Sequence, residues 1–177
     1  EGQLLSAEEG GGFAQLMALL ESERGDSAST LVVDGGDALG AAPLASFDQG
    51  ALVAELLARA SYDAMVVGNH EFDYGLDMLR VRLERMGFPV LAANVQVTGD
   101  NPFKKWVVVE RAGLRIALVG LLSPAMAKVI NPLRNPGLKI VAPAAALEQI
   151  LPAMRDSADY IIALVHMEED EALELAQ

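Results

Sequence analysis

Residues 64–73 read AMVVGNHEFD, an apolar run followed at once by a polar loop that begins with glycine. The run of four apolar residues at 64–67 predicts a short strand in the interior of a sheet. Gly-Asn-His-Glu then places an amide, an imidazole and a carboxylate directly after that strand. A given tetrapeptide of this kind is expected by chance in well under about one chain in a hundred of this length. The segment therefore predicts a buried strand with polar, chemically active side chains at its carboxyl end.

The same arrangement of an apolar run and a polar end occurs twice more. Residues 30–33 lead into Asp34-Gly35-Gly36-Asp37, and residues 160–165 lead into His166. Both runs favour strands, and the first is expected to be buried on both faces. Ligands of α/β proteins gather beyond the carboxyl ends of the strands, so Asp37, Asn69 and His166 are expected to lie close together.

Segments with helical spacing separate these strands. Apolar spacing predicts helices over residues 12–24, 47–60, 75–86 and 144–155, and a further strand at residues 90–93. Residues 106–110 and 115–121 predict a hairpin, and residues 123–143, with four of the eight prolines, predict an irregular excursion. The triple glycine at 10–12 predicts a turn, because no Gly-Lys-Ser/Thr follows it as in a phosphate loop. Strands that alternate with helices indicate an α/β domain with helices on the sheet faces.

Composition limits the size of the domain and the kind of partner. The chain has 177 residues, of which 52% are hydrophobic, and this suits one compact domain. Its 13 basic and 25 acidic residues give a net charge of -12, so a nucleic-acid polymer is not expected as a partner. With no cysteine, any metal ligands must be His, Asn, Asp or Glu. The longest apolar runs, such as residues 114–122, are too short for a bilayer, so no transmembrane segment is predicted.

Each candidate residue also has a purely structural interpretation. Asn69 suits a helix N-cap with a hydrogen-bonded His70 beside it. The segment at 35–37 has ordinary turn composition, and spacing alone does not decide between Asp34 and Asp37 as a metal ligand. In the functional interpretation of the same motif, Asp73, three residues after His70, is placed to accept an imidazole N–H and so fix the tautomer of the ring.

The final strand ends in the second of only two histidines in the chain. A lone imidazole at such a position is often a satisfied structural group. The acidic residues 168–171 fit the first turn of a solvated helix, which the helix dipole favours, better than they fit a metal site. Both His70 and His166 nevertheless fall at strand ends, and this coincidence favours a functional role for each.

Taken together, the Gly-Gly-Asp at 35–37, the Gly-Asn-His-Glu-Phe-Asp at 68–73 and the strand that ends in His166 resemble the calcineurin-like metallophosphoesterases, and within them the 5′-nucleotidase family. The similarity continues through Asn101-Pro102-Phe103 and Val119-Gly120-Leu121. The resemblance implies a four-layer α/β/β/α sandwich, in which two facing mixed sheets lie between helices. Residues 1–177 would form part of the catalytic domain, without the C-terminal domain that binds the nucleoside.

The resemblance also implies roles for five residues. Asp37 resembles the carboxylate that bridges two divalent metal ions, such as Mn or Zn, Asn69 a ligand of one ion, and His166 a further ligand of that same ion. His70 and Asp73 resemble the catalytic dyad that stabilises charge on the phosphoryl group or the leaving oxygen. The implied reaction is two-metal hydrolysis of a small phosphate ester, first of all a nucleotide, with cyclic nucleotides, sugar nucleotides and thiosulfate-type esters as alternatives.

Some motifs of the family are not found in this sequence. The opening Asp-x-His is absent from residues 1–10, and the closing Gly-His-x-His would lie downstream of His166. The expectation is therefore a fragment that binds metal weakly and has negligible activity alone. The alternative is a non-catalytic binding or interaction module on the same scaffold. The family is usually exported, which implies a periplasmic or extracellular location, although residues 1–9 show no signal peptide.

Overall fold

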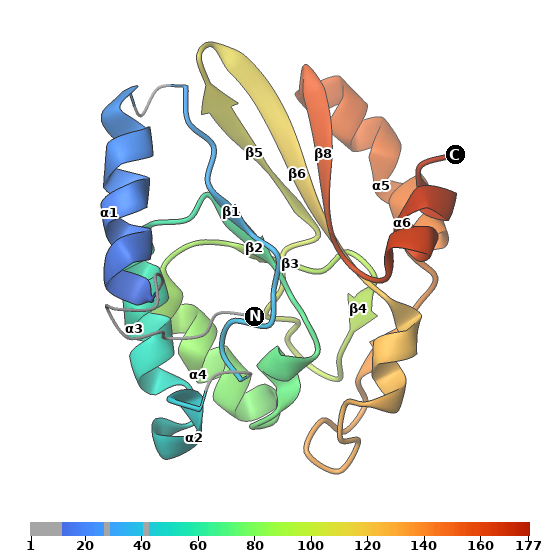
Figure 1. Cartoon of the computed structure of the whole chain (residues 1–177). Helices are drawn as coiled ribbons and strands as arrows, with labels where there is room; N and C mark the ends of the chain where they lie inside the picture. The colour runs from blue at the N-terminus through green and yellow to red at the C-terminus, as the bar shows by residue number, and fades with distance from the viewer. Residues whose placement is uncertain (1–11, 27–28, 41–42) are drawn as a thin grey trace.

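The computed structural model describes residues 12–26, 29–40 and 43–177, so the first two glycines of the turn predicted at residues 10–12 lie outside it (Figure 1). The helices are α1 (Phe13–Glu23), α2 (Ala45–Asp48), α3 (Ala51–Ala60), α4 (Leu76–Met86), α5 (Pro143–Ser157) and α6 (Glu169–Leu175), with 3-10 turns at Arg24–Asp26, His70–Phe72 and Pro124–Lys128. The strands are β1 (Val33–Asp34), β2 (Ala64–Val66), β3 (Val90–Leu91), β4 (Val95–Gln96), β5 (Trp106–Arg111), β6 (Leu114–Leu122), β7 (Lys139–Ile140) and β8 (Tyr160–His166).

The strands form two main sheets and one small pair. β1, β2 and β3 are parallel neighbours in that order. In the second sheet β6 is antiparallel to β5 and parallel to β8, so this sheet is mixed, as the resemblance implied. The first sheet is parallel over its described strands rather than mixed, because helices α3 and α4 carry the chain back to the same edge each time. β4 and β7 form a short antiparallel pair that the sequence did not predict.

The two sheets face each other between two layers of helices. Figure 1 shows α1, α3 and α4 on one side of the molecule and α5 and α6 on the other. Side chains alternate along β2 and β6, so each strand contributes to two interior layers. Met65 of β2 packs with the residues of α3 and α4, whereas Ala64 meets Leu118 of β6 between the sheets, and Val119 faces Met154 of α5. This arrangement confirms the four-layer α/β/β/α sandwich.

The two sheets touch through their backbones beside β3. The N–H of Ala93, just after β3, donates to the carbonyl oxygen of Gly120 in β6 at 2.7 Å. A Cβ atom built at Gly120 would overlap the backbone and side chain of Leu91 in β3. The absence of a side chain at residue 120 therefore allows this close approach.

Two predicted elements differ in the structure. The helix predicted at residues 47–60 is interrupted, since Gln49 adopts a left-handed φ of 56° and the Asp48 carboxylate caps α3 by accepting the N–H groups of Ala51 and Leu52. The strand predicted at 30–33 is shifted to β1. It is not buried on both faces, because Val33 is 37% exposed and β1 pairs with β2 alone among the described strands.

The remaining predicted helices and the hairpin of β5 and β6 are confirmed with small changes at their ends. Among the helices of the described residues, none combines the length and apolar character that a bilayer span requires.

Candidate functional site

Two of the three residues expected to lie together, Asp37 and His166, meet where strands of both sheets end, and His70 joins them. β1 and β2 are parallel, so the loops at residues 35–40 and 67–73 leave the first sheet at the same edge. His166, at the end of β8 in the second sheet, reaches these loops: its Nε2 lies 3.4 Å from Oδ2 of Asp37. The other carboxylate oxygen of Asp37, Oδ1, accepts the backbone N–H of His70 at 2.9 Å. Asp37, His70 and His166 are therefore neighbours despite the 129 positions that separate the first from the last in sequence.

The tautomer of His166 follows from its second contact. Nδ1 lies 2.9 Å from the carbonyl oxygen of Gly35, and because a carbonyl oxygen only accepts, Nδ1 carries the proton. In the neutral ring the lone pair of Nε2 then faces the carboxylate of Asp37, which is also an acceptor. Two acceptors in this position attract a cation, either a proton or a metal ion. In agreement, the hydrogen bond to Asp37 outweighs burial and raises the pKa of His166 to about 9.

The carboxylate of Asp37 is stabilised in its charged form. Partial burial acts to raise its pKa, but hydrogen bonds from His166 and from the His70 N–H outweigh burial, so the pKa is lowered overall. Its backbone has a φ of 62°, a left-handed conformation that is uncommon for residues other than glycine.

Asp34, the alternative ligand, takes part in a different set of contacts. Its Oδ1 accepts the N–H of Gly36 at 2.9 Å, and its carboxylate pairs with the hydroxyl of Tyr62. Burial raises the pKa of Asp34, and burial together with the nearby Asp34 charge raises the pKa of Tyr62 to about 12. The geometry therefore separates the two carboxylates that spacing left undecided, since Asp37 faces His166.

His70 and Asp73 form the hydrogen bond that their spacing predicted. Nδ1 of His70 lies 2.8 Å from Oδ2 of Asp73, and the two side chains are 43% and 42% exposed. This hydrogen bond, partly opposed by burial, raises the pKa of His70. With Nδ1 engaged, Nε2 is the ring nitrogen left for a substrate. The catalytic role of the pair stays a prediction.

Asn69 precedes the 3-10 turn at His70–Phe72, but its side chain does not cap that turn. In the part of the chain that the structure describes, the side-chain amide of Asn69 makes no hydrogen bond. Asn69 therefore stands at the N-cap position, as the structural interpretation predicted, but does not cap the turn with its side chain, so its side-chain oxygen is free to act as a ligand.

These donors suit a divalent cation but do not complete a site. Across residues 12–26, 29–40 and 43–177, no three His, Cys, Asp or Glu side chains are grouped so that they could hold a metal ion. Asp37 and His166 form a pair of donors, and Asn69 adds an amide oxygen in the adjacent loop. This mixture of oxygen and nitrogen ligands fits Mn or Zn, although tetrahedral and octahedral sites take four to six ligands. The acidic run at 168–171 begins α6, as the helical interpretation predicted.

No individual role was predicted for Glu71, the carboxylate of the Gly-Asn-His-Glu motif, or for Gly40. Glu71 is only 2% exposed, and its carboxylate lies behind the loops that carry Asp37 and Asn69. Burial raises the pKa of Glu71, against the effect of the N–H groups that bind it. The sequence hint to the burial of Glu71 is its place directly before the apolar Phe72, which is buried in the core, but this position does not reveal which groups the carboxylate binds.

A Cβ built at Gly40 would overlap the carbonyl oxygen of His70 and lie 2.7 Å from Oδ2 of Asp73.

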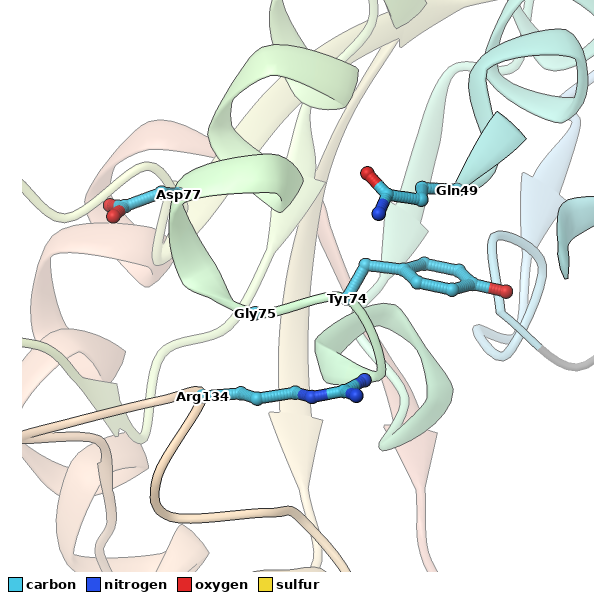
Figure 2. Close-up of a pocket in the computed structure, with 5 residues that line it drawn as sticks. All are labelled: Gln49, Tyr74, Gly75, Asp77 and Arg134. Carbon is cyan, nitrogen blue, oxygen red and sulfur yellow. The ribbon is translucent and has the colours of Figure 1, made fainter. Parts of the chain in front are cut away.

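A polar hollow of about 420 Å³ lies beside the dyad and is lined by Gln49, Tyr74, Gly75, Asp77 and Arg134 (Figure 2). Tyr74 follows Asp73 directly, and Nη1 of Arg134 donates to the backbone oxygen of Asp73 at 2.7 Å. Figure 2 shows the side chains of Tyr74 and Arg134 extending in the same direction, while Asp77 points away from them.

Comparison with known proteins identifies the family. No family model matches the sequence. The 5′-nucleotidase of Vibrio cholerae serotype O1 is 31% identical over 157 residues, which are 86% of this chain and 28% of that protein. Among solved structures, a 5′-nucleotidase precursor from Thermus thermophilus superimposes with a TM-score of 0.81 at 28% identity, covering 93% of this chain and 33% of that one.

A third comparison gives the wider fold family. The calcineurin-like phosphoesterase YfkN from Bacillus subtilis has a TM-score of 0.71 at 26% identity, over 88% of this chain and 54% of that chain. The chain belongs to the 5′-nucleotidase family of calcineurin-like phosphoesterases. This 5′-nucleotidase homologue spans about a third or less of the Vibrio and Thermus 5′-nucleotidases.

Proposed function

We propose that the protein containing this chain hydrolyses phosphate esters, nucleotides first of all, with divalent metal ions. The observation that carries the proposal is the position of the His70–Asp73 pair beside Asp37. Oδ1 of Asp37 accepts the His70 N–H, and Oδ2 of Asp37 faces His166. Phosphoester hydrolysis with metal ions uses side chains that bind the metal and an imidazole that handles charge on the substrate. Asp37 with His166, and His70 with Asp73, offer these two groups side by side. Nucleotides come first because the relatives of matching sequence are 5′-nucleotidases.

The proposed role of each residue follows from its contacts. Asp37, Asn69 and His166 would hold metal, which when bound supplies positive charge for the phosphate oxygens and acidifies a water molecule. His166 binds through Nε2, because Gly35 occupies its Nδ1. His70, oriented through Nδ1 by Asp73, places Nε2 to stabilise negative charge on the phosphoryl group or to protonate the leaving oxygen.

The hollow beside Asp73 is proposed to receive the leaving group of the substrate. It adjoins the dyad through Tyr74, and Arg134 supplies a cation at its wall. In an active full-length protein, Arg134→Ala should raise KM for a nucleotide by about 3- to 10-fold, with a much smaller effect on p-nitrophenyl phosphate. Arg155→Ala, at an exposed position of α5, is the matched control. Equal KM values for the nucleotide in the Arg134 variant and the control would contradict this placement.

A non-catalytic module on the same scaffold is the second candidate. The observation that favours it is that the described residues bring together only part of a ligand set. We extend the first proposal to say that the 177 residues alone have negligible activity, because metal affinity depends on the number of ligands. Robust metal-dependent turnover by this chain alone would contradict that extension. A periplasmic or extracellular location is also proposed, on the basis of family membership alone.

Two substitutions in a full-length protein test the proposed roles. Asp37→Ala should lower metal affinity by more than about 100-fold and abolish turnover, because a ligand is lost. His70→Ala should lower kcat by about 100- to 10,000-fold and leave the metal content nearly unchanged. Metal content is measured by elemental analysis, and Glu148→Gln, at an exposed position of α5, serves as the control. If Asp37→Ala and His70→Ala retained equal metal, the division of roles would be wrong.

A further inference from the structure

One carboxylate joins the two loops that carry the candidate ligands. Glu71 accepts three backbone N–H groups, from Asp37 at 2.8 Å, Leu39 at 2.9 Å and Gly68 at 2.7 Å. Asp37 and Leu39 lie in the loop after β1, whereas Gly68 lies in the loop after β2. No side-chain cation accompanies Glu71 among the ion pairs of the described residues.

The two loops also bind each other in the opposite direction. Asp37 of the first loop accepts the N–H of His70 in the second, and Glu71 of the second accepts the N–H of Asp37 in the first. Asp37 is therefore held through its backbone N–H and through its side chain while its backbone adopts a left-handed conformation. Such a conformation persists in a non-glycine residue only where the surroundings over-determine it.

A carboxylate is the side chain that fits these three donors. Both of its oxygens only accept, and Oε2 takes the N–H groups of Asp37 and Gly68 while Oε1 takes that of Leu39. A glutamine of the same size would turn its NH2 group toward at least one N–H. A buried charge is costly unless it is hydrogen-bonded in this way, so the side chain is stable here only with the loops in place.

We propose that Glu71 is a positioning residue of this site, whose carboxylate fixes Asp37 relative to Asn69 and His70 without touching substrate. By holding the N–H of Asp37, it sets the direction of the Asp37 carboxylate, so that Oδ1 meets His70 and Oδ2 faces His166. Its link to metal binding rests on the proposed function, whereas its hold on the two loops does not.

Amide hydrogen exchange in the unmodified 177-residue chain tests the hold on the loops. The amides of Asp37, Leu39 and Gly68 are expected to be protected at least about tenfold relative to free peptide, since hydrogen bonds to a charged acceptor are strong. In Glu71→Gln, one or more of them should exchange at least about tenfold faster, while Val119 in β6 stays protected. Free exchange of all three in the unmodified chain would overturn the proposal, whatever the variant does.

Manganese titration separates positioning from simple packing. Broadening of the NMR signals of Asn69 and His166 by Mn²⁺ should need about tenfold more metal in Glu71→Gln than in the unmodified chain or in Glu148→Gln. Equal titrations in a folded Glu71→Gln would overturn the positioning role. If Glu71→Gln does not fold, Glu71→Asp takes its place, and an unchanged titration in that variant counts against the proposal. No broadening in the unmodified chain would contradict the proposed metal site, and the exchange measurement would still decide the role of Glu71.

Discussion

The two halves of the candidate site are held in place in different ways. Asp37, His70 and Asp73 lie in two adjacent loops of one sheet, and backbone hydrogen bonds to carboxylates fix these loops to each other. His166 comes from the other sheet and meets the loops through a hydrogen bond to Gly35 and an ion pair with Asp37. The first half is therefore a local construction, whereas the second depends on how the two sheets stack.

This difference implies that damage to the interior and damage to the loops separate experimentally. Loss of packing between the sheets should displace His166 and leave the loop contacts intact. A change inside the loops should disturb the dyad and leave the stack of sheets intact.

Leu118→Ala is expected to have the largest effect on stability. Leu118 is fully buried between the sheets with Ala64 and Leu91. Its truncation leaves a cavity, so the free energy of unfolding should fall by about 2 to 5 kcal/mol in urea denaturation. The NMR signals of His166 should shift, while the amides of Asp37 and Gly68 stay protected.

Leu173→Ala is the matched control, because Leu173 in α6 is exposed and its truncation should change stability by less than about 0.5 kcal/mol. Loss of protection at both loop amides in Leu118→Ala would show that the loops are not a local construction.

Gly40→Ala should damage the dyad while the fold is retained. The added methyl group overlaps the carbonyl oxygen of His70 and crowds Asp73, so the hydrogen-bonded pair must move. In an active full-length protein kcat should fall by about 10- to 100-fold with unchanged metal content, as expected for a small misplacement. Gly25→Ala, where no atom lies within 4 Å of the new Cβ, is the control. Full activity in Gly40→Ala would show that close packing of Gly40 against His70 and Asp73 does not hold the dyad in place.

Part of the fold and of the candidate site could be predicted from the sequence, and part could not. The turn at Ala112-Gly113 between two apolar runs predicted the hairpin, and the polar residues after each run predicted the meeting of Asp37 and His166. The β4–β7 pair was missed because it joins Val95 to Ile140 through two residues on each side, too few to leave a periodic pattern.

Glu71 was missed for a different reason. Carboxylates in loops are normally solvated, and nothing in the spacing shows that three N–H groups from two loops converge on this one. The break after Asp48 was missed because apolar spacing continues through α3, although Asp48 itself is a cap residue.

Asp159→Asn should give the smallest effect, at the start of β8. The Asp159 carboxylate binds the N–H and guanidinium of Arg115 in exposed positions, and these contacts lower its pKa below the ordinary value of 3.8. A lowered pKa stabilises the fold at pH values above 3.8, and this contribution is lost as the pH falls through the pKa of the folded state.

The urea midpoint of Asp159→Asn should therefore lie slightly below that of the unmodified chain at about pH 6, and the gap should close on acidification toward about pH 2. Asp156→Asn, at an exposed position of α5, is the control. A gap that widens on acidification would reverse the sign of this prediction.

The contact at Gly120 has a consequence for the thickness of the whole sandwich. Backbone meets backbone there, so the spacing of the two sheets at that point is set by the backbone and by the absence of a side chain at residue 120. A larger residue elsewhere between the sheets would have to tilt them about this pivot rather than push them apart. His166, carried at the tip of the strand beside β6, would swing with such a tilt.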